Sequence, residues 1–315
     1  MNKEIYYIWV SEHNHGRNIS EADAEKYFNK AIDLGMKVIH IESTEYPDSL
    51  RMIEDPPLIL FCFGDISLLK NFSVGIVGTR RASPYGRWAA YEIGKTLAQF
   101  GVTHVSGMAE GIDSVGHKAV LDGNGESIAV LGTGLDVCFP RSSRDIYELL
   151  KSRGLIISEY PPGTSGYPMN FPERNRIISG LSAKVVIVEG ALRSGSLITA
   201  KLALAQGKDL YAVPGNINQP NSIGPNCLIE DGAMPIVNPT EIANILGISS
   251  MIKEKAGLIL EGLDKEIYEL IEASGAISVE EVIEFFKISP ELVLAKLTSM
   301  ELQGFLQIED GIVHI

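Results

Sequence analysis

Short runs of consecutive apolar residues alternate with amphipathic stretches from about residue 73 onward. The apolar runs predict strands and the amphipathic stretches predict helices: strands at 74–78, 102–106, 127–131, 155–158, 184–189, 209–213 and 235–237, and helices at 85–100, 109–122, 143–152, 196–206 and 239–246. Because the runs are continuously apolar, both faces of these strands should be buried, as in a parallel sheet covered by helices. The pattern predicts an α/β domain with a Rossmann-like, doubly wound and mainly parallel sheet.

The N-terminal part follows a different pattern. A capping box at Ser20 opens a helix that stops at Gly35, a short strand follows at 38–41, and residues 58–64 form a buried strand candidate. We predict a small N-terminal α/β or helical segment over residues 1–70.

The C-terminal part predicts three helices followed by a hairpin. The helices are expected at 264–273, 278–287 and 289–303, and the strands at 305–308 and 312–315. This is the order of a winged helix-turn-helix, so we predict a Rossmann-like domain over 71–250 and a winged-helix domain over 255–315. The third helix offers few basic side chains in an acidic domain, which favours a protein-contact or structural role over DNA reading.

The distribution of charge changes what the net charge of −13 implies. Residues 1–70 hold seven basic and 12 acidic side chains, and residues 255–315 hold four lysines and 12 carboxylates, so residues 71–254 keep 16 of each sign. Binding of a polyanion depends on the local field, so this neutral domain can still present a basic groove.

Cysteine spacing and hydropathy exclude several protein classes. Cys62, Cys138 and Cys227 lack the spacing of a zinc site or a disulfide framework, and no apolar run is long enough for a signal peptide or a membrane span. We expect a reduced, cytoplasmic protein without a metal site.

Candidate binding residues lie where predicted strands end, the edge at which open α/β sheets place their ligands. After the first strand, Gly78 permits a tight turn, and Arg80 and Arg81 follow it beside a helix N-terminus. Helix amides and guanidiniums both favour phosphate, although an ordinary turn with surface arginines explains the same residues.

The turn after the second strand contains Ser106, Gly107 and Gly111 and leads into a helix. Asp113 and His117 stand four residues apart on that helix, a spacing that permits general-base catalysis. No nucleophile or third metal ligand accompanies them, so helix capping and a buried, hydrogen-bonded imidazole are favoured.

A basic and aromatic segment follows the middle strands. Arg141 comes after a further glycine turn, and Phe171 precedes Arg174, Asn175 and Arg176. Guanidiniums can hold phosphates and the ring can stack on a base, whereas core packing and a structural ion pair are the alternative explanation.

The turn after strand 184–189 places four small residues at a helix start, namely Ser194, Gly195, Ser196 and Thr199. Free helix amides beside three hydroxyls make a seat for phosphate. The chain has neither a Walker-type phosphate loop nor Gly-x-Gly-x-x-Gly after the first strand. Several phosphate-sized sites along one edge suit a polymer better than a single nucleotide.

The motifs together resemble the DNA-processing protein A family, also called DprA or Smf. They occur in order between about residues 47 and 247: GTRRASPYG, SGMAEGID, GTGLD, ISEYPPG, FPERNRIISGLS, VVIVEG, SGSLITA, VPG and GPNCLIEDGA. The acidic C-terminal part also resembles a domain found in part of that family.

The resemblance implies a homodimer that binds single-stranded DNA, protects it during natural transformation and loads the RecA recombinase onto it, without catalysis or a cofactor. It implies phosphate contacts for Arg80, Ser106-Gly107, Arg174, Arg176 and Ser194-Gly195-Ser196, a base contact for Phe171, and an extended basic rim at Arg141. Pro168 departs from the family, where a lysine is common, and Gly116 stands where relatives usually have alanine. Helices at 196–206 and 224–231 are candidates for the dimer surface.

Two other functions fit parts of the sequence. A phosphoribohydrolase-like nucleotide enzyme shares the fold class, but its Pro-Gly-Gly-x-Gly-Thr-x-x-Glu motif is replaced here by SGSLITA with no glutamate following. A protein-interaction scaffold explains the acidic ends but not the loop arginines. We therefore predict a DNA-handling protein.

Overall fold

The computed structural model describes residues 2–249, 260, 262–302, 305–309 and 311–315. The chain forms two compact units, one from residues 1–98 and 102–242 and the other from residues 99–101 and 243–315. The predicted N-terminal segment and the predicted Rossmann-like domain therefore contribute to the same unit. None of the described helices has the length and apolar character needed to cross a membrane.

The first unit is built on a nine-stranded sheet with the order β1-β2-β6-β5-β4-β3-β7-β8-β9. The strands are β1 (Lys37–His40), β2 (Ile59–Gly64), β3 (Ser73–Val77), β4 (Thr103–Ser106), β5 (Ser127–Val130), β6 (Leu155–Ser158), β7 (Lys184–Ile187), β8 (Asp209–Ala212) and β9 (Met234–Pro235). In the stretch β6-β5-β4-β3-β7-β8-β9, every pair of neighbouring strands is parallel. Strand β2 pairs antiparallel with β6 on one side and with β1 on the other. The predicted mainly parallel, Rossmann-like sheet is confirmed, and two antiparallel strands from the N-terminal segment extend it.

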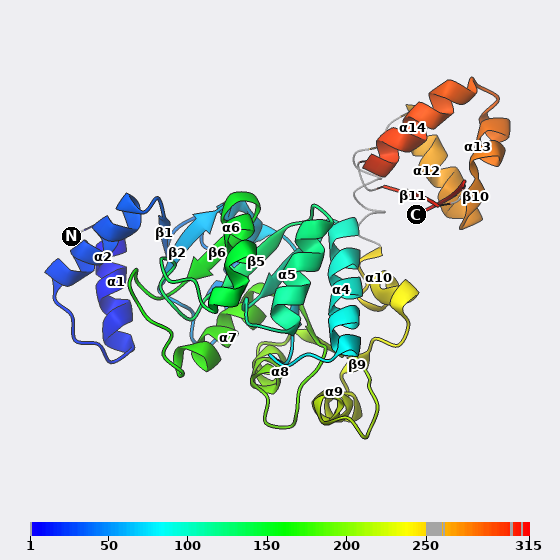
Figure 1. Cartoon of the computed structure of the whole chain (residues 1–315). Coiled ribbons are helices and arrows are strands. Elements are labelled where there is room, and N and C mark those ends of the chain that lie inside the picture. The colour runs from blue at the N-terminus through cyan, green and yellow to red at the C-terminus, as the bar shows by residue number, and fades with distance from the viewer. Residues whose placement is uncertain (1, 250–259, 261, 303–304, 310) are drawn as a thin grey trace. The chain divides into compact units, whose positions relative to one another are not determined.

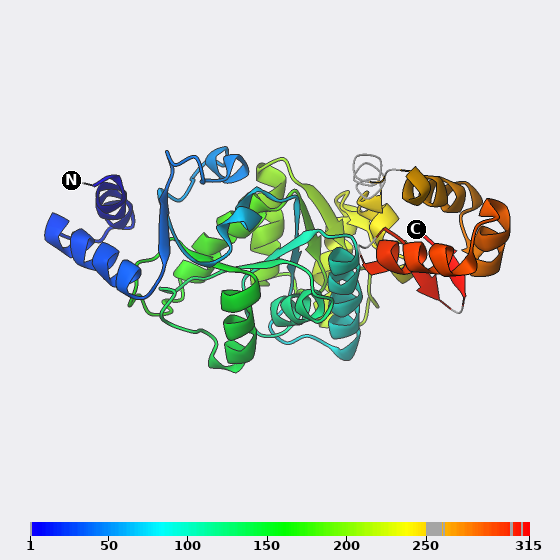
Figure 2. The ribbon, with the colours of Figure 1, turned by 90° about the horizontal axis from the view of Figure 1, so that it is seen from above.

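Helices cover both faces of this sheet (Figures 1 and 2). Helices α7 and α8 pack on one face, and α5 and α6 pack on the other. The helices described up to residue 249 are α1 (Lys3–Asn14), α2 (Glu21–Asp33), α3 (Asp48–Arg51), α4 (Pro84–Gln99), α5 (Ile112–Asp122), α6 (Arg144–Arg153), α7 (Asn170–Leu181), α8 (Gly195–Ala205), α9 (Pro220–Glu230) and α10 (Ile242–Ile245), with 3-10 turns at Ile66–Lys70, Arg141–Ser143 and Pro239–Glu241. All but the first residue of α10 belong to the second unit. Helices α1 and α7 are not predicted by the apolar pattern.

The second unit has its own core and a small sheet. Its elements are α12 (Gly262–Ser274), β10 (Ile277–Ser278), α13 (Val279–Phe286), α14 (Pro290–Leu302), β11 (Gln307–Glu309) and β12 (Ile312–His314). Ile267, Leu297 and Val313 are fully buried in its core. The three helices and the terminal hairpin appear in the predicted order, and β10 adds a third, antiparallel strand.

The strand order determines where a ligand can enter the first unit. From β3 the chain adds β4, β5 and β6 on one side and later adds β7, β8 and β9 on the other. The connections after β3 and β7 therefore diverge at the carboxyl ends of adjacent strands, the place at which open α/β sheets usually bind their ligands. Seven of the 15 candidate residues lie in the connections that follow β3 and β7, and the others lie at the end of β4 or in the connections after β4, β5 and β6.

Candidate nucleic-acid interface

An exposed arginine lies over an aromatic ring at this edge of the sheet. The guanidinium carbon of Arg80, in the loop after β3, is 5.5 Å from the ring centroid of Phe171 on α7. The Phe171 ring in turn lies 5.2 Å from that of Phe139, which is 42% exposed. We call Phe139 and Phe171 the aromatic platform. Sequence reasoning missed Phe139, although its position two residues before Arg141 was an available signal.

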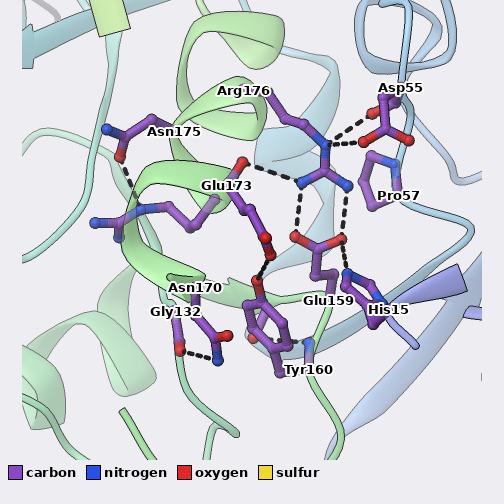
Figure 3. Close-up of polar contacts among 12 residues, drawn as sticks. His15, Asp55, Pro57, Gly132, Glu159, Tyr160, Asn170, Glu173, Asn175 and Arg176 are labelled. Atoms are coloured by element: carbon purple, nitrogen blue, oxygen red, sulfur yellow. Dashed lines mark hydrogen bonds and ion pairs between the residues drawn. The ribbon is translucent and has the colours of Figure 1, made fainter. Parts of the chain in front are cut away.

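Glycines and an asparagine hold the platform in place. A side chain at Gly132 or Gly166 would place its Cβ 3.0 or 3.2 Å from the Phe171 ring, tighter than normal packing. The Asn170 amide at the start of α7 donates to the Gly132 carbonyl at 3.0 Å (Figure 3). The ring position is therefore fixed by the turn after β5 and by the first residue of α7.

Arg174 lies beneath this surface and is only 4% exposed. Its Nη1 donates to the carbonyl oxygens of Gly107, at 2.9 Å, and Val130. Burial, opposed by the nearby Asp113 carboxylate, lowers the pKa of Arg174 to about 10, so the side chain is a buried cation at neutral pH. In this structure Arg174 supports the turn after β4, and its phosphate contact stays a prediction.

Arg176 forms an ion pair with the buried Glu159 (Figure 3). Its two terminal nitrogens donate to the two oxygens of Glu159 at 2.6 and 2.7 Å, and its Nε donates to Asp55 at 2.9 Å. These donors hold the pKa of Glu159 at about 2, despite burial that opposes the charged form. The structure thus engages Arg176 in an intramolecular pair, the alternative that the sequence left open for one of these arginines.

Asn175 connects the helices α7 and α8. Its Oδ1 accepts from Arg174 Nε at 3.2 Å, and its Nδ2 donates to the Gly195 carbonyl at 3.5 Å. The side chain therefore joins the buried arginine to the first residue of α8.

Asp113 organises the turn after β4 from inside the protein. Its Oδ2 accepts from the amides of Gly107 and Ala109 at 3.2 and 3.4 Å. The Ser106 hydroxyl is buried and donates to the Ile76 carbonyl at 2.7 Å. Burial raises the pKa of Asp113, which the adjacent Arg174 cation opposes. Asp113 is thus a loop-positioning residue.

Glycines let the loops after β3 and β4 lie against each other. Gly111 has φ +83°, and a Cβ there would lie 2.3 Å from the Thr79 carbonyl oxygen. A Cβ at Gly78 would lie 2.4 Å from the Ile112 side chain. Both glycines therefore fix the position of the loop after β3, which carries Arg80. They can affect ligand binding through this loop without contacting the ligand themselves.

His117 is fully buried and belongs to a second polar cluster. Its Nδ1 lies 2.7 Å from the Ser127 hydroxyl, which also lies 2.9 Å from His104 Nδ1. Within the described part of the chain, neither Nε2 has a hydrogen-bond partner. Burial lowers the pKa of His104 to about 3 and that of His117 well below its ordinary value. These contacts agree with the structural role favoured for His117 and separate it from the carboxylate of Asp113.

The start of α8 collects the predicted hydroxyls. Ser194 caps the helix by accepting from the Ser196 amide at 3.3 Å, and the two hydroxyls lie 2.8 Å apart. Thr199 is fully buried, and its hydroxyl has no partner among the described residues. Capping accounts for Ser194, but it does not account for all three hydroxyls.

The remaining candidate arginines are exposed at the same edge. Arg81 follows Arg80, and its carbonyl oxygen accepts from Asn221 Nδ2 at 3.0 Å. Arg141 is exposed at the start of its 3-10 turn. Sequence reasoning also missed Glu189, a buried carboxylate that accepts from the Ser83 amide at 2.9 Å and so fixes the start of α4. The structure therefore separates three exposed arginines, Arg80, Arg81 and Arg141, from the buried Arg174 and the half-buried Arg176.

The chain is similar to known proteins in sequence and in fold. The family model described as DNA recombination-mediator protein A matches residues 37–247. Protein Smf of Escherichia coli is 48% identical over 207 residues, which are 65% of this chain and 55% of that protein. The DNA processing protein DprA of Bacillus subtilis is 41% identical over 209 residues, which are 66% of this chain and 70% of that protein. The match thus spans about half of the E. coli protein.

Two solved structures resemble the fold. DNA processing protein A from Streptococcus pneumoniae has a TM-score of 0.67 at 32% identity and covers 78% of this chain and 93% of its own. The protein from Helicobacter pylori, whose structure is described in terms of a single-stranded DNA binding mode, has a TM-score of 0.61 at 31% identity and covers 69% of this chain and 97% of its own. Family model, sequence relatives and fold agree, and the chain belongs to the DNA recombination-mediator protein A family.

Proposed function

We propose that this protein binds single-stranded DNA along the carboxyl edge of its sheet, protects it and loads the RecA recombinase onto it. The observation that carries the proposal is the exposed Arg80 guanidinium over Phe171, with Phe139 beside it. A cation next to an exposed aromatic surface suits a phosphate followed by an unpaired base.

The arrangement favours a single strand over a duplex. A ring can stack only on a base whose face is free, and in a duplex both faces are covered by neighbouring bases. The exposed Arg80, Arg81 and Arg141 can contact successive phosphates, and such contacts do not depend on base sequence. The single-stranded DNA binding mode described for the H. pylori relative supports the proposed binding of a single strand.

The binding test compares single-stranded and duplex DNA of equal length by fluorescence anisotropy. We expect the single strand to bind more tightly than the duplex. Phe171→Ala should reduce this preference, because the ring stacks on unpaired bases and cannot stack on the bases of a duplex. Equal affinity for both forms in the wild type would contradict the proposal. Phe285→Ala is the matched control, because this exposed phenylalanine belongs to the second compact unit.

Protection and RecA loading need separate measurements. We expect the protein to slow digestion of single-stranded DNA by an exonuclease and to accelerate RecA filament formation on DNA already coated by a single-strand-binding protein. Binding without any effect on RecA would leave a DNA-protecting protein and remove the mediator step from the proposal.

We also propose a homodimer that uses α8 and α9. Ile198 and Leu204 on α8 and Ile223 on α9 are exposed apolar side chains on helices that the sequence singled out as candidates. Leu204→Glu should give a monomer in analytical ultracentrifugation, whereas Leu149→Glu on α6 should leave a dimer. A monomeric wild type at micromolar concentration would remove this part of the proposal.

We propose no catalytic activity. The side chains that could act as an acid-base pair, Asp113 and His117, are both buried and have structural partners. Incubation with nucleoside monophosphates should release no free base, and release that requires Glu189 or Asp113 would instead support the nucleotide enzyme.

A further inference from the structure

Two neighbouring aromatic side chains are exposed at the first turn of α4. Tyr85 is 44% exposed and Trp88 is 47% exposed. Their ring centroids lie 5.9 Å apart with an angle of 33° between the planes. We call Tyr85 and Trp88 the α4 aromatic pair. Since the opposite face of α4 already packs through buried residues such as Ala90 and Ile93, core packing does not explain the pair.

The α4 aromatic pair lies on the same chain segment as Arg80. At one end of this segment Arg80 contacts Phe171, and at the other end the Tyr85 hydroxyl donates to the Pro214 carbonyl at 2.8 Å. Between them, the Arg81 carbonyl accepts from Asn221. The segment therefore runs from Phe171 of the aromatic platform to the connection between β8 and α9. It contacts an aromatic ring at one end and carries Tyr85 and Trp88 at the other.

The segment is also locally basic in an acidic chain. Residues 79–91 contain Arg80, Arg81 and Arg87 and no carboxylate, although the net charge of the chain is −13. All three arginines are exposed. The buried Glu189 carboxylate beneath the loop is engaged by Ser83. Exposed rings flanked by cations suit an anionic partner that also presents flat apolar surfaces.

We propose that Tyr85 and Trp88 form a second stacking platform for bases of single-stranded DNA, reached by the strand after it passes Arg80 and Arg81. This inference rests on the proposed single-strand binding and adds a direction for the strand, from the α7 side of the sheet toward the β8–α9 side. The Tyr85 hydrogen bond to Pro214 fixes its ring beforehand, and Trp88 presents the larger surface. Stacking on such rings tolerates any base sequence.

The experiment measures binding of an oligothymidylate of about 20 nucleotides, long enough for more than one stacking site. The probes are this strand and an abasic strand of equal length, and the variants are Trp88→Ala, Trp88→Phe and Arg80→Ala. Phe72→Ala is the matched control, because Phe72 is partly exposed just before β3, at the opposite edge of the sheet. Circular dichroism and ultracentrifugation establish that each variant is folded and has the wild-type oligomeric state.

We expect Trp88→Ala to weaken binding of the oligothymidylate by at least about fivefold, the lower end of the range for one stacked base. Trp88→Phe should retain most of the affinity, and Phe72→Ala should bind as wild type. On the abasic strand Trp88→Ala should match wild type, because only the bases contact the ring, whereas Arg80→Ala should weaken binding of both strands. Tryptophan fluorescence should be quenched by the oligothymidylate in wild type and not in Trp88→Phe. The other tryptophan, Trp9, lies on α1 with its indole donating to the Ile19 carbonyl, away from the proposed path of the strand.

The possible failures are distinguishable. If wild type binds neither strand, the proposed function is wrong and this inference falls with it. If Arg80→Ala weakens binding but Trp88→Ala does not, single-strand binding stands and the second platform is wrong. If Trp88→Ala changes the oligomeric state and weakens both strands equally, the pair is an interface between copies of the chain, which also overturns the inference.

Discussion

Two arginines two residues apart on α7 have different environments, and neither resembles an exposed phosphate clamp. Arg174 donates to backbone carbonyls beneath the turn after β4, and Arg176 pairs with Glu159. Their partners are distant in sequence, so no local pattern reveals them. By contrast, Arg80 and Arg81 lie in a turn that the local sequence predicts, and both side chains are exposed.

The Arg176–Glu159 pair should dominate local stability. Glu159 is buried, so Glu159→Gln leaves the half-buried Arg176 cation with only the exposed Asp55 as a charged partner and should lower the free energy of unfolding by roughly 3–5 kcal/mol. Asp55→Asn removes the other, largely exposed partner of Arg176 and should cost less than about 1 kcal/mol. Denaturant unfolding of both variants measures the two losses in unfolding free energy. Equal losses would show that the buried Glu159 contributes no more to stability than the exposed Asp55.

The buried histidines predict acid sensitivity. The folded-state pKa values of His104 and His117 are depressed, so both are neutral when folded and take up protons on unfolding below pH 6.5. Stability should be complete above pH 6.5 and fall as pH decreases, by up to about 2.7 kcal/mol per pH unit for the two groups. His15, whose pKa is raised by Glu159, is charged in both states below pH 6.5 and adds no slope there.

Chemical unfolding of wild type and His117→Gln between pH 5 and 6.5 tests this sign. The depressed pKa of Glu159 acts only below about pH 4.5, and the raised pKa of Asp113, which adds stability as pH falls, is common to both proteins. In His117→Gln the loss of stability per pH unit should be smaller by up to about 1.4 kcal/mol, whatever the change in absolute stability. Equal dependence on pH in the two proteins would contradict the burial of a neutral His117 imidazole.

At the scale of elements, the sequence predicts the alternation of strands and helices but not α7. No helix is predicted over residues 170–181, yet α7 forms there. It tolerates Pro172, because a proline in the first turn removes an amide that no helical hydrogen bond requires. The apolar pattern likewise does not predict α1, whose aromatic residues pack against buried side chains of β2. Both elements owe their structure to tertiary packing that local periodicity does not record.

The contact between the loops after β3 and β4 predicts a selective effect of Gly111→Ala. The added Cβ would meet the Thr79 and Arg80 carbonyls, and the backbone is strained for any other residue, so we expect a loss of roughly 2–4 kcal/mol in unfolding free energy and weaker DNA binding. Gly207→Ala has a similar positive φ but open space, and it should cost only about 1 kcal/mol with DNA affinity unchanged. Equal effects of the two substitutions on DNA affinity would argue against the loop contact.

At the scale of the molecule, the C-terminal part of the chain differs from the rest in its strongly negative charge. Residues 255–315 contribute 12 carboxylates and four lysines, so this part repels a polyanion. Deletion of residues 255–315 should therefore leave the affinity for single-stranded DNA within about twofold of wild type, as measured by anisotropy at physiological salt. A large loss would assign DNA contacts to the acidic unit and contradict its proposed protein-contact role.

The central claim is that exposed arginines at the carboxyl edge of the sheet hold the phosphates of a single strand. The most direct measurement is the dependence of binding on salt for wild type, Arg80→Ala and the matched control Arg153→Ala, whose arginine is exposed just before β6 at the opposite edge. We predict that affinity falls steeply with salt, and that Arg80→Ala reduces the slope by about 0.7, one phosphate contact, while Arg153→Ala does not. A shallow slope in wild type, or the same slope in all three proteins, would contradict the account.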